Sequence, residues 1–167
     1  MNDIVRIDAR VVGFSPEPKR ILSVCFRETG EILVQKEVAF SSNAVEKQYQ
    51  ANTIVVTDAP ELIADWQMSF DAKTHLDQVI SMYQLRMRSR RVEIENALRR
   101  YDPSNILQIR KIDKNGIQQE FDSSALDNGH LAVLLSVWAS SEIALNYSCI
   151  TPDTHMDIDT TLLPRSF

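Results

Sequence analysis

The chain has 167 residues, of which 44% are apolar and 25% are charged, and its formal net charge is −5. This length suits one ordinary domain, and the composition is globular rather than disordered. The longest apolar run, between Leu131 and Ala139, is too short to cross a bilayer, which needs about 20 apolar residues. The first residues carry no secretory signal. We therefore expect a cytoplasmic protein, or one assembled into a particle in the cytoplasm, that has no contact with a membrane.

The first half of the chain is rich in strand patterns. Residues 3–14 alternate in polarity as a strand does. Residues 21–27 and 31–40 indicate two further strands, and Gly30 between them can supply the positive φ of a hairpin turn. Residues 53–57, Thr-Ile-Val-Val-Thr, form a β-branched run that predicts another short strand. Asp58-Ala-Pro-Glu then has the residues of a helix start, so we expect a short helix that carries Leu62, Ile63 and Trp66 toward the core.

The spacing of apolar residues predicts one long helix from Asp71 to Tyr101. Apolar side chains recur at steps of three and four residues, and no Gly or Pro interrupts them. Asp71 can cap the first turn, and Asp102-Pro103 can end the last one. We expect this helix to organise the fold.

The second half of the chain mixes strand and helix signals. Residues 106–112 and 116–121 flank Asp113-Lys-Asn-Gly116, whose Asn-Gly pair is a strong hairpin signal. Periodicity does not separate a buried helix from a buried strand over residues 131–139. The alternation of residues 142–149 favours a strand. The predicted fold class is α+β, with a mostly antiparallel sheet of hairpins packed against the helix of residues 71–101. We expect residues 1–150 to form a single domain and residues 151–167 an extended C-terminal tail.

Charge is distributed unevenly along the chain. The net charge is −4 over residues 1–85, +5 over residues 86–111 and −6 over residues 112–167. The basic block predicts an interaction surface that contains six arginines of the long helix: Arg86, Arg88, Arg90, Arg91, Arg99 and Arg100. Its partner is either phosphate or carboxylate. The spread of these side chains around a helix and the acidity of the whole chain favour a protein partner over nucleic acid.

The C-terminal tail offers a complementary surface. It combines acidic and apolar side chains in an extended pattern: Asp153, Met156, Asp157, Ile158, Asp159, Leu162, Leu163 and Phe167. A segment of this kind can add a strand to a sheet edge. We expect it to dock near the basic end of the long helix, in its own chain or in a neighbouring subunit.

Sequence signatures of catalysis are missing. There is no glycine-rich phosphate loop, no Gly-x-Ser-x-Gly elbow, no Cys-x-x-Cys pair and no His-Glu-x-x-His. Scattered carboxylates such as Asp3, Asp8 and Asp58 can in principle converge as a metal-dependent nuclease site, but their spacing does not single them out. We therefore predict no catalytic residues, no metal and no cofactor.

Uneven charge without catalytic motifs favours a non-enzymatic subunit. The interpretation we prefer is a protein-protein assembly component of a phage virion or tail that associates with copies of itself or with a larger complex. The alternatives are a phage-encoded inhibitor of a host protein and a nucleic-acid-binding accessory protein that uses the arginines. Metal-dependent enzymatic activity ranks third.

Overall fold

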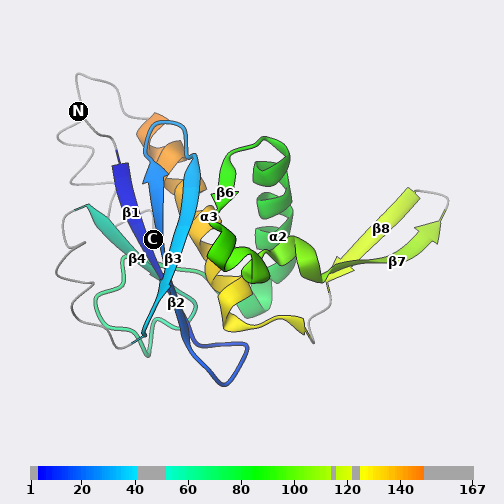
Figure 1. Cartoon of the computed structure of the whole chain (residues 1–167), viewed down its shortest axis with the longest axis horizontal. Coiled ribbons are helices and arrows are strands. Elements are labelled where there is room, and N and C mark those ends of the chain that lie inside the picture. Colours follow the sequence, from blue (N-terminus) through cyan, green and yellow to red (C-terminus); the bar gives the residue numbers. More distant parts are fainter. Residues whose placement is uncertain (1–3, 41–51, 114–115, 122–124, 149–167) are drawn as a thin grey trace.

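The computed structural model describes residues 4–40, 52–113, 116–121 and 125–148. A six-stranded sheet forms the centre, in the order β5-β4-β1-β2-β3-β6, with helices on one side and a separate hairpin, β7-β8, that projects from the body (Figure 1). The strands are β1 (Ile4–Val11), β2 (Lys19–Phe26), β3 (Ile32–Val38), β4 (Thr53–Thr57), β5 (Met68–Ser69), β6 (Val92–Ile94), β7 (Leu107–Asp113) and β8 (Gly116–Phe121). The helices are α2 (Ala72–Arg88), α3 (Asn128–Ser148) and the 3₁₀ segments η1 (Asn96–Tyr101) and η2 (Pro103–Ile106).

The predicted α+β class is confirmed, since antiparallel hairpins in a six-stranded sheet pack against helices. Strands β1, β2 and β3 form an antiparallel meander, and Gly30 has the positive φ, 76°, expected at the turn between β2 and β3. The hairpin predicted around Asn115-Gly116 is also present as β7 and β8. The outer strands are parallel to their neighbours: β4 to β1, β5 to β4 and β6 to β3.

Helix α3 occupies the centre of the core. It packs against β1 and β2 on one side and against α2 on another. Its first half, which includes Leu131, Leu134, Leu135 and Val137, is completely buried. Residues 131–139 are therefore helical. The strand that we predicted over residues 142–149 is wrong, because the same helix continues to Ser148 with Ile143 buried and Leu145 exposed.

The predicted helix from Asp71 to Tyr101 ends at Arg88. Asp71 caps its start as expected, because the Asp71 side chain accepts from the Thr74 N–H. At the other end Arg90 adopts a left-handed φ of 59°, and the Arg91 N–H donates to the Arg86 carbonyl. This is the closing pattern of a Schellman motif. Val92 and Ile94 are β-branched and pair with β3 as strand β6.

The short helix predicted after Asp58 is also absent. Residues 58–67 form successive turns, with Ile63 buried and Leu62 exposed. The Asp-Ala-Pro-Glu start is present, but the Asp58 carboxylate accepts from the Val12 N–H, and Asp65 adopts a left-handed φ of 60°. The predicted tail, residues 151–167, lies outside the described residues, and the division into domain and tail stays a prediction. None of the described helices is long and apolar enough to cross a membrane.

Candidate active site

A pocket opens where the parallel strands β1, β4 and β5 end. Because these strands are parallel, their carboxyl ends meet at one edge of the sheet, and helix α2 begins directly after β5. The pocket has a volume of about 530 Å³, and its lining includes Gly13, Asp58, Glu61, Asp71 and Lys73. Ligand sites in open sheets with parallel strands occupy this position, outside the carboxyl ends of the strands. This pocket is our candidate active site.

Asp58 is the most enclosed carboxylate of the pocket. Its Oδ1 atom accepts from the Val12 N–H at 3.1 Å. Its Oδ2 atom lies over Gly13, so close that a Cβ atom on Gly13 would be 2.2 Å away. Burial raises the pKa of Asp58, although backbone hydrogen bonds and the charge of Lys73 act in the opposite direction. A carboxylate shifted by burial next to a cation in a pocket is typical of functional sites.

Asn128 holds the loop that carries Gly13. This side chain is fully buried at the start of α3. Its Oδ1 atom accepts from the backbone N–H groups of Phe14, at 2.8 Å, and Ser15, at 3.2 Å. Its Nδ2 atom donates to the carbonyls of Ser15, at 3.0 Å, and Glu17, at 2.7 Å. The amide is thus satisfied on both sides, and it ties the loop after β1 to the central helix.

The other two carboxylates of the pocket, Asp71 and Glu61, are exposed. Asp71 is engaged by α2: its Oδ1 atom accepts from the Thr74 N–H at 3.2 Å, and its Oδ2 atom accepts from the Thr74 hydroxyl at 2.8 Å. These hydrogen bonds lower the pKa of Asp71, so it is ionised at neutral pH. Within the part of the chain that the structure describes, no three His, Cys, Asp or Glu side chains come together to hold a metal ion.

Of the carboxylates considered from the sequence, the structure describes Asp8 and Asp58, and these two do not meet in the pocket. Asp8 lies in the middle of β1 and forms a buried ion pair with Arg20, whose Nε and Nη2 atoms lie 2.9 and 2.8 Å from the two carboxylate oxygens. Arg10 adds a second ion pair, at 2.9 Å. Arg10 and Arg20 therefore balance the charge of Asp8 inside the sheet. Asp3 lies outside the described residues. Of the two that the structure describes, only Asp58 lines the pocket.

The six arginines of the predicted surface fall into two groups. Arg86 and Arg91 bind the turn between β2 and β3, where they donate to the carbonyls of Gly30 and Thr29. Arg88 and Arg90 project nearby at the end of α2, and both are exposed.

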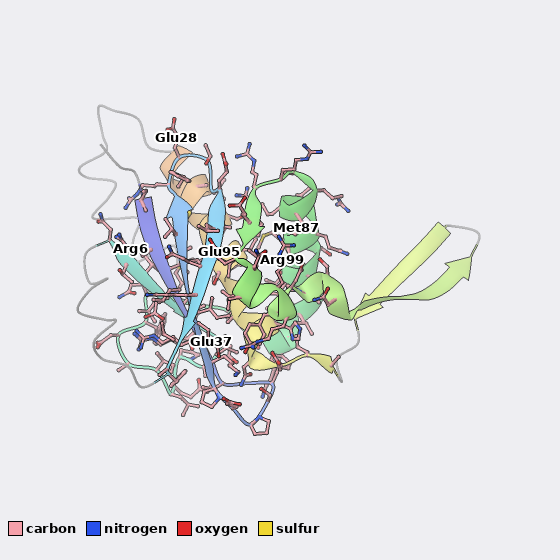
Figure 2. All side chains as sticks on the ribbon, in the orientation of Figure 1. Arg6, Glu28, Glu37, Met87, Glu95 and Arg99 are labelled. Atoms are coloured by element: carbon pink, nitrogen blue, oxygen red, sulfur yellow. The ribbon has the colours of Figure 1, made fainter. Side chains whose placement is uncertain are left out.

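Arg99 and Arg100 belong to η1 instead. Arg99 donates to the Asn96 side chain, and Arg100 forms an ion pair with Glu37 at 2.9 Å. Figure 2 shows Glu37 and Glu28, a residue of the β2-β3 turn, toward opposite ends of the molecule. The structure therefore does not bring the six side chains into one surface.

The predicted interaction tail lies outside the described residues. Cys25 is free and buried, and burial raises the pKa of its thiol to about 12, which makes it unreactive.

Sequence reasoning missed Gly13, Lys73 and Asn128, and it gave Asp58 no special weight. The available signal was local: Asp58 directly follows a β-branched strand. What the sequence does not show is that β4 pairs in parallel with β1, which brings Asp58 to Gly13.

Comparison with known proteins reveals a likeness in fold. No family model and no curated protein matches the sequence. The fold is similar to the crystal structure of the large terminase nuclease from thermophilic phage G20c, with a TM-score of 0.50 and 15% sequence identity. The likeness covers 80% of this chain and 81% of that one.

This likeness corrects our expectation from the sequence. We expected a non-enzymatic assembly subunit, but the chain has the fold of a nuclease. That expectation rested on the absence of contiguous catalytic motifs in the sequence.

Proposed function

We propose that this protein is a nuclease that hydrolyses phosphodiester bonds of nucleic acid at the Asp58 pocket. The observation that carries the proposal is the position of Asp58: an enclosed carboxylate at the carboxyl ends of three parallel strands, on the fold of a nuclease. Lys73 in the same pocket supplies a positive charge for a phosphate oxygen.

Nucleases of many folds use divalent cations. The described residues do not form a closed protein cage. They fit Mg²⁺, which is usually held by one or two carboxylates and completed by water and substrate phosphate. Asp58 would hold the ion, with Glu61 or Asp71 as the second carboxylate. When bound, the ion would polarise a phosphoryl oxygen and lower the pKa of water.

The chain's own residues prepare this site. The Val12 N–H fixes one oxygen of Asp58, and Gly13 leaves room for the other. Asn128 holds the loop in place, so the carboxylate does not need to reorganise when substrate arrives.

The test is cleavage of plasmid DNA, single-stranded DNA and RNA with and without Mg²⁺. We expect Asp58→Asn to reduce cleavage about 10³-fold, which corresponds to about 4 kcal/mol of lost transition-state stabilisation. Asp77→Asn is the matched control, because Asp77 is an exposed carboxylate of α2 outside the pocket lining. Equal activity of both variants, or no cleavage of any substrate by the unchanged protein, would contradict the proposal.

A further inference from the structure

A second charged surface lies at the far end of α2 from the pocket. We call it the basic tip, and it consists of Arg86, Arg88, Arg90 and Arg91. The pocket contains the first residues of α2, whereas the basic tip contains its last residues and the turn into β6. In Figure 1 this turn lies at the top of the view, near the turn between β2 and β3.

Two of the four arginines of the basic tip are held by backbone carbonyls, and the other two are exposed. Arg86 and Arg91 are held by the carbonyls of Gly30 and Thr29. Arg88 and Arg90 are exposed, and their side chains make no hydrogen bond or ion pair within the residues that the structure describes. The fixed pair therefore anchors the turn and leaves two guanidinium groups for a partner.

The arginines of the basic tip place positive charges close together, which is electrostatically unfavourable in the free protein. Burial and then the neighbouring charge of Arg91 lower the pKa of Arg86, while Glu31 acts in the opposite direction. The four arginines form no ion pair with a carboxylate in the described part of the chain. Like charges held together without such a pair are favourable for an anionic partner.

An uncharged stripe connects the tip with the pocket. Four exposed, uncharged residues recur at steps of three and four along α2, and Arg88 of the basic tip continues the row: Thr74, Gln78, Ser81 and Leu85. The helix has 17 residues with a kink at His75, so its length along the chain is about 25 Å, or about seven base-pair steps of a duplex at 3.4 Å each. The exposed carboxylate that borders this stripe is Asp77, three residues after Thr74 and four before Ser81.

We propose that the basic tip binds the phosphate backbone of a nucleic acid duplex about seven base pairs from the phosphate that occupies the Asp58 pocket. The inference rests on the proposed function, because it assumes that the pocket receives a phosphodiester. Arg88 and Arg90 supply the contacts, since guanidinium groups donate to phosphate oxygens in a bidentate manner.

The experiment measures binding without cleavage. A fluorescein-labelled 20-base-pair DNA duplex is titrated with the full chain in EDTA, and anisotropy is followed from 50 to 200 mM salt. The test variant combines Arg88→Gln with Arg90→Gly, which removes two charges and places glycine at a left-handed φ. The control combines Arg99→Gln with Arg100→Gln, which removes the same charge from η1.

We expect the slope of log K against log salt to be less negative by about 1.8 in the test variant. This corresponds to about 60-fold weaker binding at 0.1 M salt. The control variant should bind as the unchanged protein does. Equal weakening by both variants, or binding that does not depend on salt, would overturn the inference in favour of bulk charge or a protein partner. Cleavage is not required in EDTA, so weaker binding by the test variant supports the tip even if the Asp58 variant shows that the nuclease proposal is wrong.

Discussion

Gly13 and Asp58 depend on each other at the level of single atoms. The Asp58 carboxylate can occupy its place only because residue 13 has no side chain. The Gly13 backbone is not in the left-handed region, so an alanine there would meet no backbone strain, only the carboxylate. A substitution at Gly13 should therefore move the Asp58 carboxylate without destabilising the loop, because Asn128 holds the neighbouring residues independently.

We expect Gly13→Ala to reduce cleavage about 100-fold while the free energy of unfolding changes by less than about 1 kcal/mol. The added methyl group displaces the end of a side chain, and displacing a reacting group by about 1 Å can cost 10²-fold in rate. Cleavage kinetics and urea denaturation measure the two quantities. In an Asp58→Asn background the same substitution should have no further effect on the residual rate, because the affected carboxylate is gone. Additive losses would show that Gly13 acts through another group.

At the scale of elements, the end of α2 lacks the residue that usually marks the end of a helix in a sequence. A Schellman motif usually places glycine at its left-handed position, and here that position is Arg90. Without glycine or proline, the apolar spacing continues through the turn, with Ile94 buried in β6 and Leu98 and Tyr101 buried in η1. The periodic pattern was real, but it belongs to three consecutive elements rather than to one helix.

The same geometry predicts that Arg90→Gly stabilises the fold. A non-glycine residue in the left-handed region costs about 1–2 kcal/mol, and glycine does not bear this cost. We expect a gain of about 1 kcal/mol in the free energy of unfolding, measured by urea denaturation. Ser89→Gly is the control, because Ser89 has an ordinary right-handed φ of −81° and should lose stability. A loss of stability in Arg90→Gly would mean that the Arg90 side chain contributes contacts that outweigh the strain.

At the scale of the whole molecule, the sequence predicted what is local. The β2-β3 and β7-β8 hairpins follow from Gly30 and Gly116, and the cap of α2 follows from Asp71. The parallel pairings of β4, β5 and β6 join strands that are not connected by a tight turn, so no turn residue predicts them. The pocket depends on those pairings. Helix α3 was ambiguous for another reason: its first half is buried on every side, so it has no polar face to show a helical period.

The burial of Asp58 should lower the free energy of unfolding of the protein at neutral pH. Because burial raises the pKa of Asp58, the folded protein binds a proton there more tightly than the unfolded chain does. Stability contributed by this group therefore falls as pH rises through the interval between the unfolded and folded pKa values, and above that interval the full penalty remains. We expect Asp58→Asn, which is neutral at every pH, to be more stable than the unchanged protein at pH 7.

This advantage should shrink as the pH falls through that interval and vanish below the ordinary pKa of an aspartate, about 3.9, because both proteins are then neutral at residue 58. Urea denaturation in EDTA at pH 7 and at the lowest pH where both proteins fold measures the difference. Asp77→Asn should show no comparable gain, since Asp77 is exposed. A variant that loses cleavage and gains stability at neutral pH is what a functional carboxylate implies, because its position serves chemistry at the expense of folding. An Asp58→Asn protein that is less stable at pH 7 would instead assign Asp58 to holding the loop after β1.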